Sequence, residues 1–114
     1  MRRDDQHRIR HILSAAQEAT SFASGRTRAD LDVDRMLVLS LVKCIEIIGE
    51  AAANLTAETK AQHPEIPWRT IVAMRNHLIH AYFNIDLDRV WGTVVADLPL
   101  LIDQVGPLVP TEGH

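Results

Sequence analysis

Apolar residues recur at spacings of three and four along most of this 114-residue chain, which is the period of one face of an α-helix. A first helix is predicted over about residues 4–23, where Ser24 and Gly25 end the pattern. A second is predicted over about residues 33–55 and is nearly apolar around its middle. Since a helix that is apolar on most sides is buried, we expect the second helix at the centre of the fold.

Prolines divide the middle of the chain. Thr56 is a suitable N-cap for a short helix that ends at about residue 62. Pro64 and Pro67 then break the helical pattern, because a proline biases the residue before it away from helix. Pro67 also suits the start of a third main helix, which is predicted over about residues 68–83.

The last helix is predicted over about residues 87–105, with Asp86 as its N-cap. Pro99 lies inside this helix and should kink it, and Gly106 ends it. No alternating strand pattern is visible in the sequence. The sequence therefore predicts an all-α antiparallel bundle of four main helices and one short helix.

Composition indicates one globular domain over residues 1–114, with its core at about residues 4–105 and a loose tail at 106–114. Hydrophobic residues make up 46% and charged residues 24%. The net charge is −3 and the pI is about 6.0, which excludes a general polyanion binder because such proteins are usually basic. The longest apolar run, residues 36–42, is far too short to cross a membrane, and no membrane partner is expected.

Cys44 is the one cysteine in the sequence, so neither an intrachain disulfide nor a cysteine-based zinc site can form. This usage fits a reducing, cytoplasmic compartment. We expect Cys44 to be a small core residue rather than a nucleophile.

One polar cluster interrupts the third main helix. Five polar residues fall within eight positions of an otherwise apolar segment, namely Arg75, Asn76, His77, His80 and Tyr82. Buried polar groups are costly unless they are paired, so packing alone rarely places this many together. Arginine binds phosphate through a fixed fork of donors, and histidine exchanges a proton near neutral pH. Together they suffice to hold or cleave a phosphodiester.

Helical geometry limits how Arg75 and His80 can meet. Successive residues on an ideal helix turn by about 100°, so these two side chains would lie about 140° apart. They can converge only if the arginine reaches around the helix, the helix is distorted, or a second chain supplies one of them. The spacing therefore favours a site in a cleft between helices or between subunits.

Each of these residues also has a purely structural interpretation. Arg75 can form a salt bridge to Glu46 or Glu50. His80 can be a hydrogen-bonded core histidine, and His77 can be a surface residue. His77 and His80 can also bind a metal ion, but two histidines with no carboxylate on that turn are a weak site. We expect neither a metal nor a cofactor.

The motif has recognisable neighbours. Arg75 is followed after four residues by His80, Ala81 and Tyr82. The flanking blocks are Cys-Ile-Glu-Ile-Ile-Gly-Glu-Ala-Ala at 44–52, Pro-Glu-Ile-Pro-Trp-Arg at 64–69 and Ile-Asp-Leu-Asp-Arg-Val-Trp at 85–91. With these flanks, the sequence resembles the HEPN superfamily, and specifically its HepT-like toxins, over about residues 4–105.

The resemblance implies a small helical bundle that forms a homodimer and acts as a metal-independent ribonuclease toxin. It implies catalysis by Arg75 and His80. We expect two further residues to bind substrate or support the site, namely Asn76, at the polar position that commonly follows the arginine, and His77, at a variable position. It also implies a partner, the nucleotidyltransferase antitoxin MntA, which adds AMP to the tyrosine that corresponds to Tyr82. Ala81 departs from the family pattern, where glycine is common, and removes no chemical group.

A mechanism follows from these roles. RNA carries its own nucleophile, the 2′-hydroxyl, and a histidine with a pKa near about 6.5 can remove its proton at neutral pH. Arg75 would stabilise the charge on the phosphorane oxygens. The leaving 5′-oxygen needs an acid, which the His80 of a second chain would supply. The expected product is a 2′,3′-cyclic phosphate.

Two alternatives belong to other classes of protein. One is a non-catalytic interaction module that binds a nucleotidyltransferase or a nucleotide, with Arg75 as a phosphate anchor. The other is a structural bundle in which the polar helix junction has no chemical role.

Overall fold

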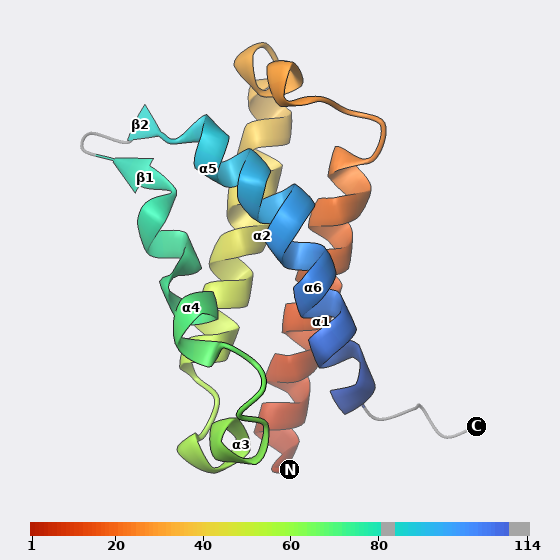
Figure 1. The fold of residues 1–114 in the computed structure, drawn as a ribbon, viewed down its shortest axis with the longest axis vertical. Coiled ribbons are helices and arrows are strands. Elements are labelled where there is room, and N and C mark those ends of the chain that lie inside the picture. The colour runs from red at the N-terminus through yellow and green to blue at the C-terminus, as the bar shows by residue number, and fades with distance from the viewer. Residues whose placement is uncertain (81–83, 110–114) are drawn as a thin grey trace.

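In a computed structural model, which describes residues 1–80 and 84–109 and only the backbone of Ile79 and His80, the chain folds as a bundle of helices (Figure 1). The predicted all-α class is confirmed. The two long helices are α1 (Arg3–Ala23) and α2 (Arg35–Ala53). The other elements are the 3₁₀ helix η1 (Arg28–Asp32), α3 (Ala57–Gln62), α4 (Trp68–Ala73), the 3₁₀ turn η2 (Met74–His77), strands β1 (Ile79–His80) and β2 (Asn84–Ile85), α5 (Leu87–Gly92), the π-helical turn η4 (Thr93–Asp97), α6 (Leu98–Val105) and the 3₁₀ turn η5 (Gly106–Leu108).

Helix α2 is the centre of the bundle, as predicted. Helix α1 packs along one side of it, and α4 and η2 pack along another (Figure 1). Small buried side chains on α1, such as Ala15, Ala16 and Ala19, let the two long helices approach closely. The core is aliphatic, and its largest fully buried side chains are Ile9, Ile12, Leu41, Ile45, Ile48, Ile66, Ile71, Leu78, Leu98, Val90, Val94 and Val105.

Charged side chains hold the connection between α1 and α2, a segment for which the sequence predicts no element. The carboxylate of Asp34 accepts a hydrogen bond from the backbone N–H of Leu37 at 3.0 Å and so caps α2. Arg26 donates to Asp34 at 2.6 Å and to Asp30 at 3.3 Å. These bonds tie η1 to the start of α2.

Asp5 joins the start of α1 to the start of α3. Its carboxylate is fully buried and accepts hydrogen bonds at 2.6 Å from the hydroxyls of Thr56 and Thr59. Arg8 donates to it at 3.3 Å. Thr56 in turn accepts from the backbone N–H of Thr59 at 3.3 Å, which confirms its predicted role as the N-cap of α3. Every donor around Asp5 favours its charged form.

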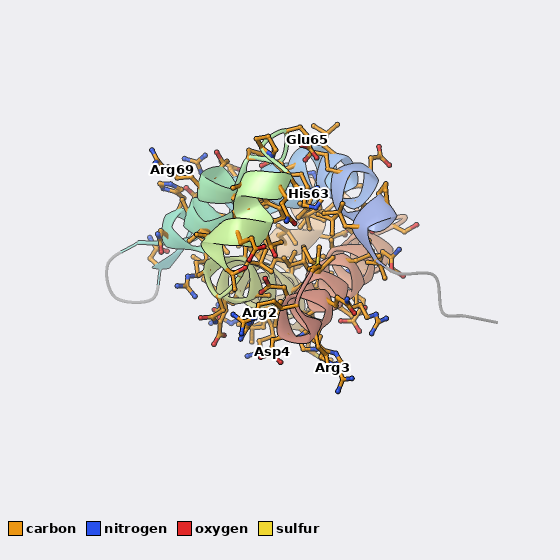
Figure 2. The ribbon with its side chains drawn as sticks, turned by 90° about the horizontal axis from the view of Figure 1, so that it is seen from below. Arg2, Arg3, Asp4, His63, Glu65 and Arg69 are labelled. Carbon is orange, nitrogen blue, oxygen red and sulfur yellow. The ribbon has the colours of Figure 1, made fainter. Side chains whose placement is uncertain are left out.

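The start of α4 is held by Trp68. Its ring N–H donates to the carbonyl of His63 at 3.0 Å, across the Pro64–Pro67 break. In the same segment, His63 Nδ1 lies 3.7 Å from a carboxylate oxygen of Glu65 (Figure 2). These contacts fix the chain where it enters the motif segment.

The predicted helix over residues 68–83 is wrong after Ala73 in the residues that the structure describes, and its last three positions, 81–83, lie outside them. Helix α4 ends at Ala73, η2 adds one tighter turn, and β1 then pairs with β2 in antiparallel fashion, His80 opposite Asn84. The backbone N–H of Asp86 donates to the carbonyl of Leu78 at 2.7 Å, which closes the pair. Residues 79–85 are rich in β-branched and aromatic side chains, which suit strands. Short apolar runs of this kind do not distinguish strand from helix by spacing.

The last predicted helix is a continuous run of α5, η4 and α6. Asp86 caps it by accepting from the backbone N–H of Arg89 at 3.0 Å, as predicted. Where Pro99 predicts a kink, the π-helical turn η4 lies directly ahead of the proline. Proline has no N–H to donate to the preceding turn, and a π-turn is one way to accommodate the missing bond. Gly106 ends α6, and the end of the predicted tail, 110–114, lies outside the described residues.

Within the part of the chain that the structure describes, no helix has the length and apolar character needed to cross a membrane.

Asp5→Ala should lower the free energy of unfolding by about 2 kcal/mol, because it leaves the hydroxyls of the buried Thr59 and the half-buried Thr56 without their acceptor. Chemical denaturation measures this. Asp4→Ala, which removes an exposed carboxylate from the same turn, should cost less than about 1 kcal/mol. Equal losses in the two variants would contradict the role given to Asp5.

The contribution of Asp5 should also depend on pH. Burial alone raises the pKa of Asp5, but the hydrogen bonds from Thr56, Thr59 and Arg8 outweigh it and leave the pKa below its ordinary value. A carboxylate whose pKa falls on folding stabilises the fold above its unfolded pKa of about 3.9 and loses that effect as pH falls. The stability difference between wild type and Asp5→Ala should therefore shrink below about pH 4. A difference that stays constant to lower pH would contradict this.

Candidate functional site

The turn η2 carries three of the predicted site residues on the surface. Arg75, Asn76 and His77 are all exposed, and they are flanked by Ile71 and Leu78, which are buried. Ile71 is 1% exposed and Leu78 is 0% exposed, so the turn is anchored in the core on both sides. Exposed polar groups on a firmly anchored turn are well placed to meet a ligand.

Arg75 lies across helix α2 at Gly49. A Cβ atom built on Gly49 would come within 3.1 Å of Arg75 Cδ and 3.4 Å of Cγ. It would also lie 3.5 Å from the carbonyl oxygen of Val72. The absence of a side chain at Gly49 therefore makes the channel in which the arginine stem runs. Gly49 lies in the block at residues 44–52 that carries part of the family resemblance, but the sequence did not predict its contact with Arg75.

The guanidinium of Arg75 has no partner among residues 1–80 and 84–109, since it makes neither a hydrogen bond nor an ion pair there. The described residues therefore show no salt bridge between Arg75 and Glu46 or Glu50. Five donors on an exposed, unpaired guanidinium are available to a phosphate or another anion.

The backbone of His80 lies in β1, opposite Asn84 of β2. The side chain of His80 and the whole of Ala81 and Tyr82 lie outside what the structure describes. The helical angle of about 140° between Arg75 and His80 no longer applies, because the helix ends before His80. The strand pair removes the geometric obstacle that a continuous helix would impose.

Asn76 and His77 face two different grooves on either side of α4. Asn76 lines one of about 480 Å³ together with Lys60 and Arg69. His77 lines one of about 320 Å³ together with Arg69 and Arg89. The two supporting residues predicted from the sequence are therefore not brought together, and Arg69 stands between their grooves.

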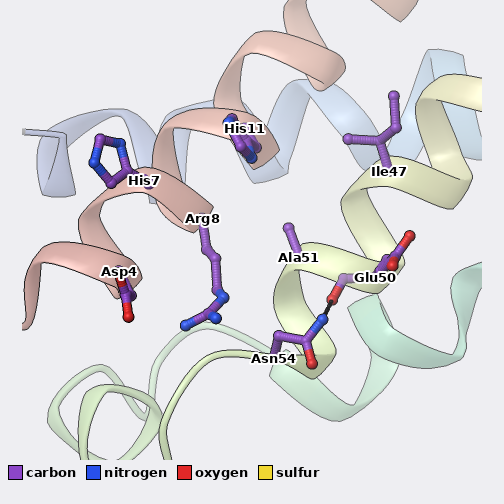
Figure 3. A pocket seen from close by; sticks show the side chains of 8 residues that line it. All are labelled: Asp4, His7, Arg8, His11, Ile47, Glu50, Ala51 and Asn54. Carbon is purple, nitrogen blue, oxygen red and sulfur yellow. Dashed lines mark hydrogen bonds between the residues drawn. The ribbon is translucent and has the colours of Figure 1, made fainter.

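A third hollow, of about 350 Å³, lies between α1 and α2 (Figure 3). It holds His7 and His11 on α1 and Glu50 on α2. Charges of both signs line it, since Asp4 and Arg8 also border it, and Arg8 is already bound to Asp5. No group of three or more metal-binding side chains forms in the described part of the chain.

Cys44 is a core residue, as predicted. It is buried in α2, and burial raises the pKa of its thiol, with a further rise from the nearby carboxylate of Glu18. Its Sγ lies 4.0 Å from Glu18 Oε1. A thiol in this setting stays protonated and is a poor nucleophile.

Comparison with known proteins gives one consistent result. The family model described as ribonuclease HepT-like matches residues 12–108. A Thermococcus cleftensis protein named "Probable ribonuclease HepT" is 37% identical over 89% of this chain and 92% of its own length. A Caldanaerobacter subterraneus protein named "Putative RNase TTE0752" is 34% identical over 91% of this chain and 93% of its own. No solved structure matches the chain significantly.

Gly49→Ala should displace the side chain of Arg75 without unfolding the protein. The new methyl group meets the flexible arginine stem, so the stem moves by a few tenths of an ångström and the stability changes by less than about 1 kcal/mol. The shift is observable as a change in the NMR resonance of the Arg75 Nε–H.

Gly92→Ala is the matched control, because a Cβ at Gly92 has no atom within 4 Å. It should leave the Arg75 resonance unchanged. An unchanged resonance in Gly49→Ala as well would contradict the packing described at Gly49.

Proposed function

This chain belongs to the ribonuclease HepT-like family, and from that premise we propose that it is an endoribonuclease that cleaves RNA without a metal ion. The observation that carries the proposal is the exposed guanidinium of Arg75, which has no hydrogen bond or ion pair to the residues that the structure describes and is held on an anchored turn five residues before His80. The names of the relatives support RNA as the substrate.

In the proposed reaction, His80 removes the proton of the 2′-hydroxyl. The 2′-oxygen then forms a bond to phosphorus while the bond from phosphorus to the 5′-oxygen breaks, and a proton reaches the 5′-oxygen from a second histidine. Arg75 stabilises the negative charge that builds up on the non-bridging oxygens. The products are a 2′,3′-cyclic phosphate and a free 5′-hydroxyl.

The second histidine is the reason to propose a homodimer. Imidazole cannot act as base and acid on one substrate at the same moment, and each chain has one His80. A symmetric pair of chains supplies two copies of both His80 and Arg75 at one interface. A monomeric form that still cleaves RNA would contradict the composite site.

We also propose that the protein is the toxin of a toxin–antitoxin pair. A nucleotidyltransferase partner of the MntA kind would transfer AMP from ATP to the hydroxyl of Tyr82, two residues after His80 in sequence. The bond between the tyrosine oxygen and the α-phosphorus forms as the bond to pyrophosphate breaks. The attached AMP carries bulk and negative charge, and we expect it to exclude RNA by sterics and repulsion.

Wild-type protein should cleave RNA in the presence of EDTA, and both His80→Ala and Arg75→Ala should lower the rate about a hundredfold or more. Gel analysis of a labelled RNA measures the rates. His11→Ala, which removes an exposed histidine from α1, is the control and should cleave like wild type.

Either variant cleaving at the wild-type rate would remove its residue from the reaction. Folded, unmodified wild type that cleaves no RNA would overturn the ribonuclease proposal and favour the non-catalytic interaction module.

Co-expression with the partner nucleotidyltransferase should add the mass of AMP to the peptide that contains Tyr82 and abolish RNA cleavage. Mass spectrometry of the digested protein detects the modification, and Tyr82→Phe should prevent it. An inactive complex with unmodified Tyr82 would instead show that the partner blocks the site by covering it.

A further inference from the structure

We propose that the groove between α4–η2 and α5–η4 binds backbone phosphates of the RNA beside the bond that is cut. This inference rests on the proposed ribonuclease function and adds a second contact region to it. We call this groove the α4/α5 groove. It has a volume of about 320 Å³, and its polar lining consists of Arg69, Thr70, His77, Arg89, Thr93 and Asp97.

The groove gathers basic side chains from two segments that are distant in sequence. Arg69 and His77 come from the α4–η2 segment, and Arg89 comes from α5. Arg89 is the one basic residue, lysine or arginine, in residues 76–114, against five acidic residues. The fold therefore places the single arginine of an acidic stretch opposite Arg69.

These three side chains make no hydrogen bond or ion pair to any residue that the structure describes. The acid nearest in sequence to Arg89 is Asp88, which is already held by Arg28 at 2.6 Å. Asp97 is the one carboxylate among the lining residues named above. Two guanidinium groups facing one carboxylate leave the groove with a local positive charge, although the chain as a whole carries −3.

The lining suits phosphate in particular. Guanidinium groups donate paired hydrogen bonds to phosphate oxygens, and a hydroxyl such as that of the exposed Thr70 commonly donates to them as well. Asp86 and Asp88 border a neighbouring hollow that shares Arg89 and Asp97 with the α4/α5 groove, and their charges repel phosphate from that side of Arg89. The RNA backbone is thereby confined to the side of the groove that Arg69 and His77 form.

The position of His77 connects this groove to the proposed reaction centre. His77 follows Arg75 by two residues on the same turn, and Arg75 lies toward α2 while His77 lies toward α5. One strand can therefore contact Arg75 with its scissile phosphate and the α4/α5 groove with a flanking phosphate. His77, which the sequence predicts as a substrate-binding or supporting residue, thereby has a specific role, which is contact with the flanking phosphate.

The test measures RNA binding in the His80→Ala protein, which is not expected to cut the probe. The probe is a fluorescein-labelled single-stranded RNA, followed by anisotropy at several salt concentrations. Replacing Arg69 and Arg89 together by Gln should raise Kd at least about tenfold and reduce the salt slope by about 0.7 for each lost phosphate contact. In otherwise wild-type protein, the same pair of changes should raise KM and leave kcat within about twofold.

Arg3→Gln is the matched control, since Arg3 is an exposed arginine on the opposite side of the molecule from Arg69 (Figure 2). It should leave both Kd and the salt slope unchanged. Equal effects of Arg3→Gln and the double variant would overturn the groove and indicate diffuse electrostatic attraction. If the double variant loses ATP binding but still binds RNA, the groove is a nucleotide site and the proposal is overturned.

The failure of the groove and of the ribonuclease function can be told apart. If wild type cleaves RNA and the double variant binds the probe normally, only the groove is wrong. If wild type neither cleaves nor binds RNA, both proposals are overturned.

Discussion

Helix α2 presents ten buried residues, and they point in more directions than one neighbouring helix can cover. Helix α1 covers one side with small and branched aliphatic side chains, and α4 with η2 covers another. Burial of apolar surface is the dominant favourable term in folding, so the chain gains most by packing around α2. The motif segment is held against α2 as a consequence of this packing.

The packing on α2 also explains why Arg75 is available. A buried arginine would need a charged partner, and a freely exposed one would sample many rotamers. At Gly49 the stem of Arg75 instead lies against the helix while the guanidinium remains in solvent. A glycine inside a helix lowers helix stability by roughly 1 kcal/mol relative to alanine. At Gly49 the missing side chain leaves the space in which the stem of Arg75 lies.

The sequence was a good guide to the long elements. The periodic stretches predicted α1, α2 and the final helical run to within about two residues, and Thr56 and Asp86 act as the caps expected of them. These features depend on local chemistry, which a single sequence displays. The motif residues were also identified from local chemistry, as polar groups in an apolar context.

The features that the sequence did not predict depend on contacts between residues that are distant in the chain. The break after Ala73 depends on pairing between β1 and β2, and spacing alone does not distinguish two-residue strands from helix. Asp5 meets Thr56 across 51 positions, and Gly49 meets Arg75 across 26, so neither contact leaves a local signal. The α4/α5 groove likewise unites Arg69 and Arg89, which are on separate helices.

In the proposed reaction, the RNA's own 2′-hydroxyl attacks the phosphate that Arg75, on the turn η2, holds. The most direct measurement is cleavage of an RNA whose mapped cleavage site carries a single 2′-deoxyribose on the 5′ side of the cut bond. If the 2′-hydroxyl is the nucleophile, this bond stays intact while unmodified sites in the same molecule are still cut. Cleavage at the substituted bond would contradict it, because the attacking oxygen would then have come from elsewhere.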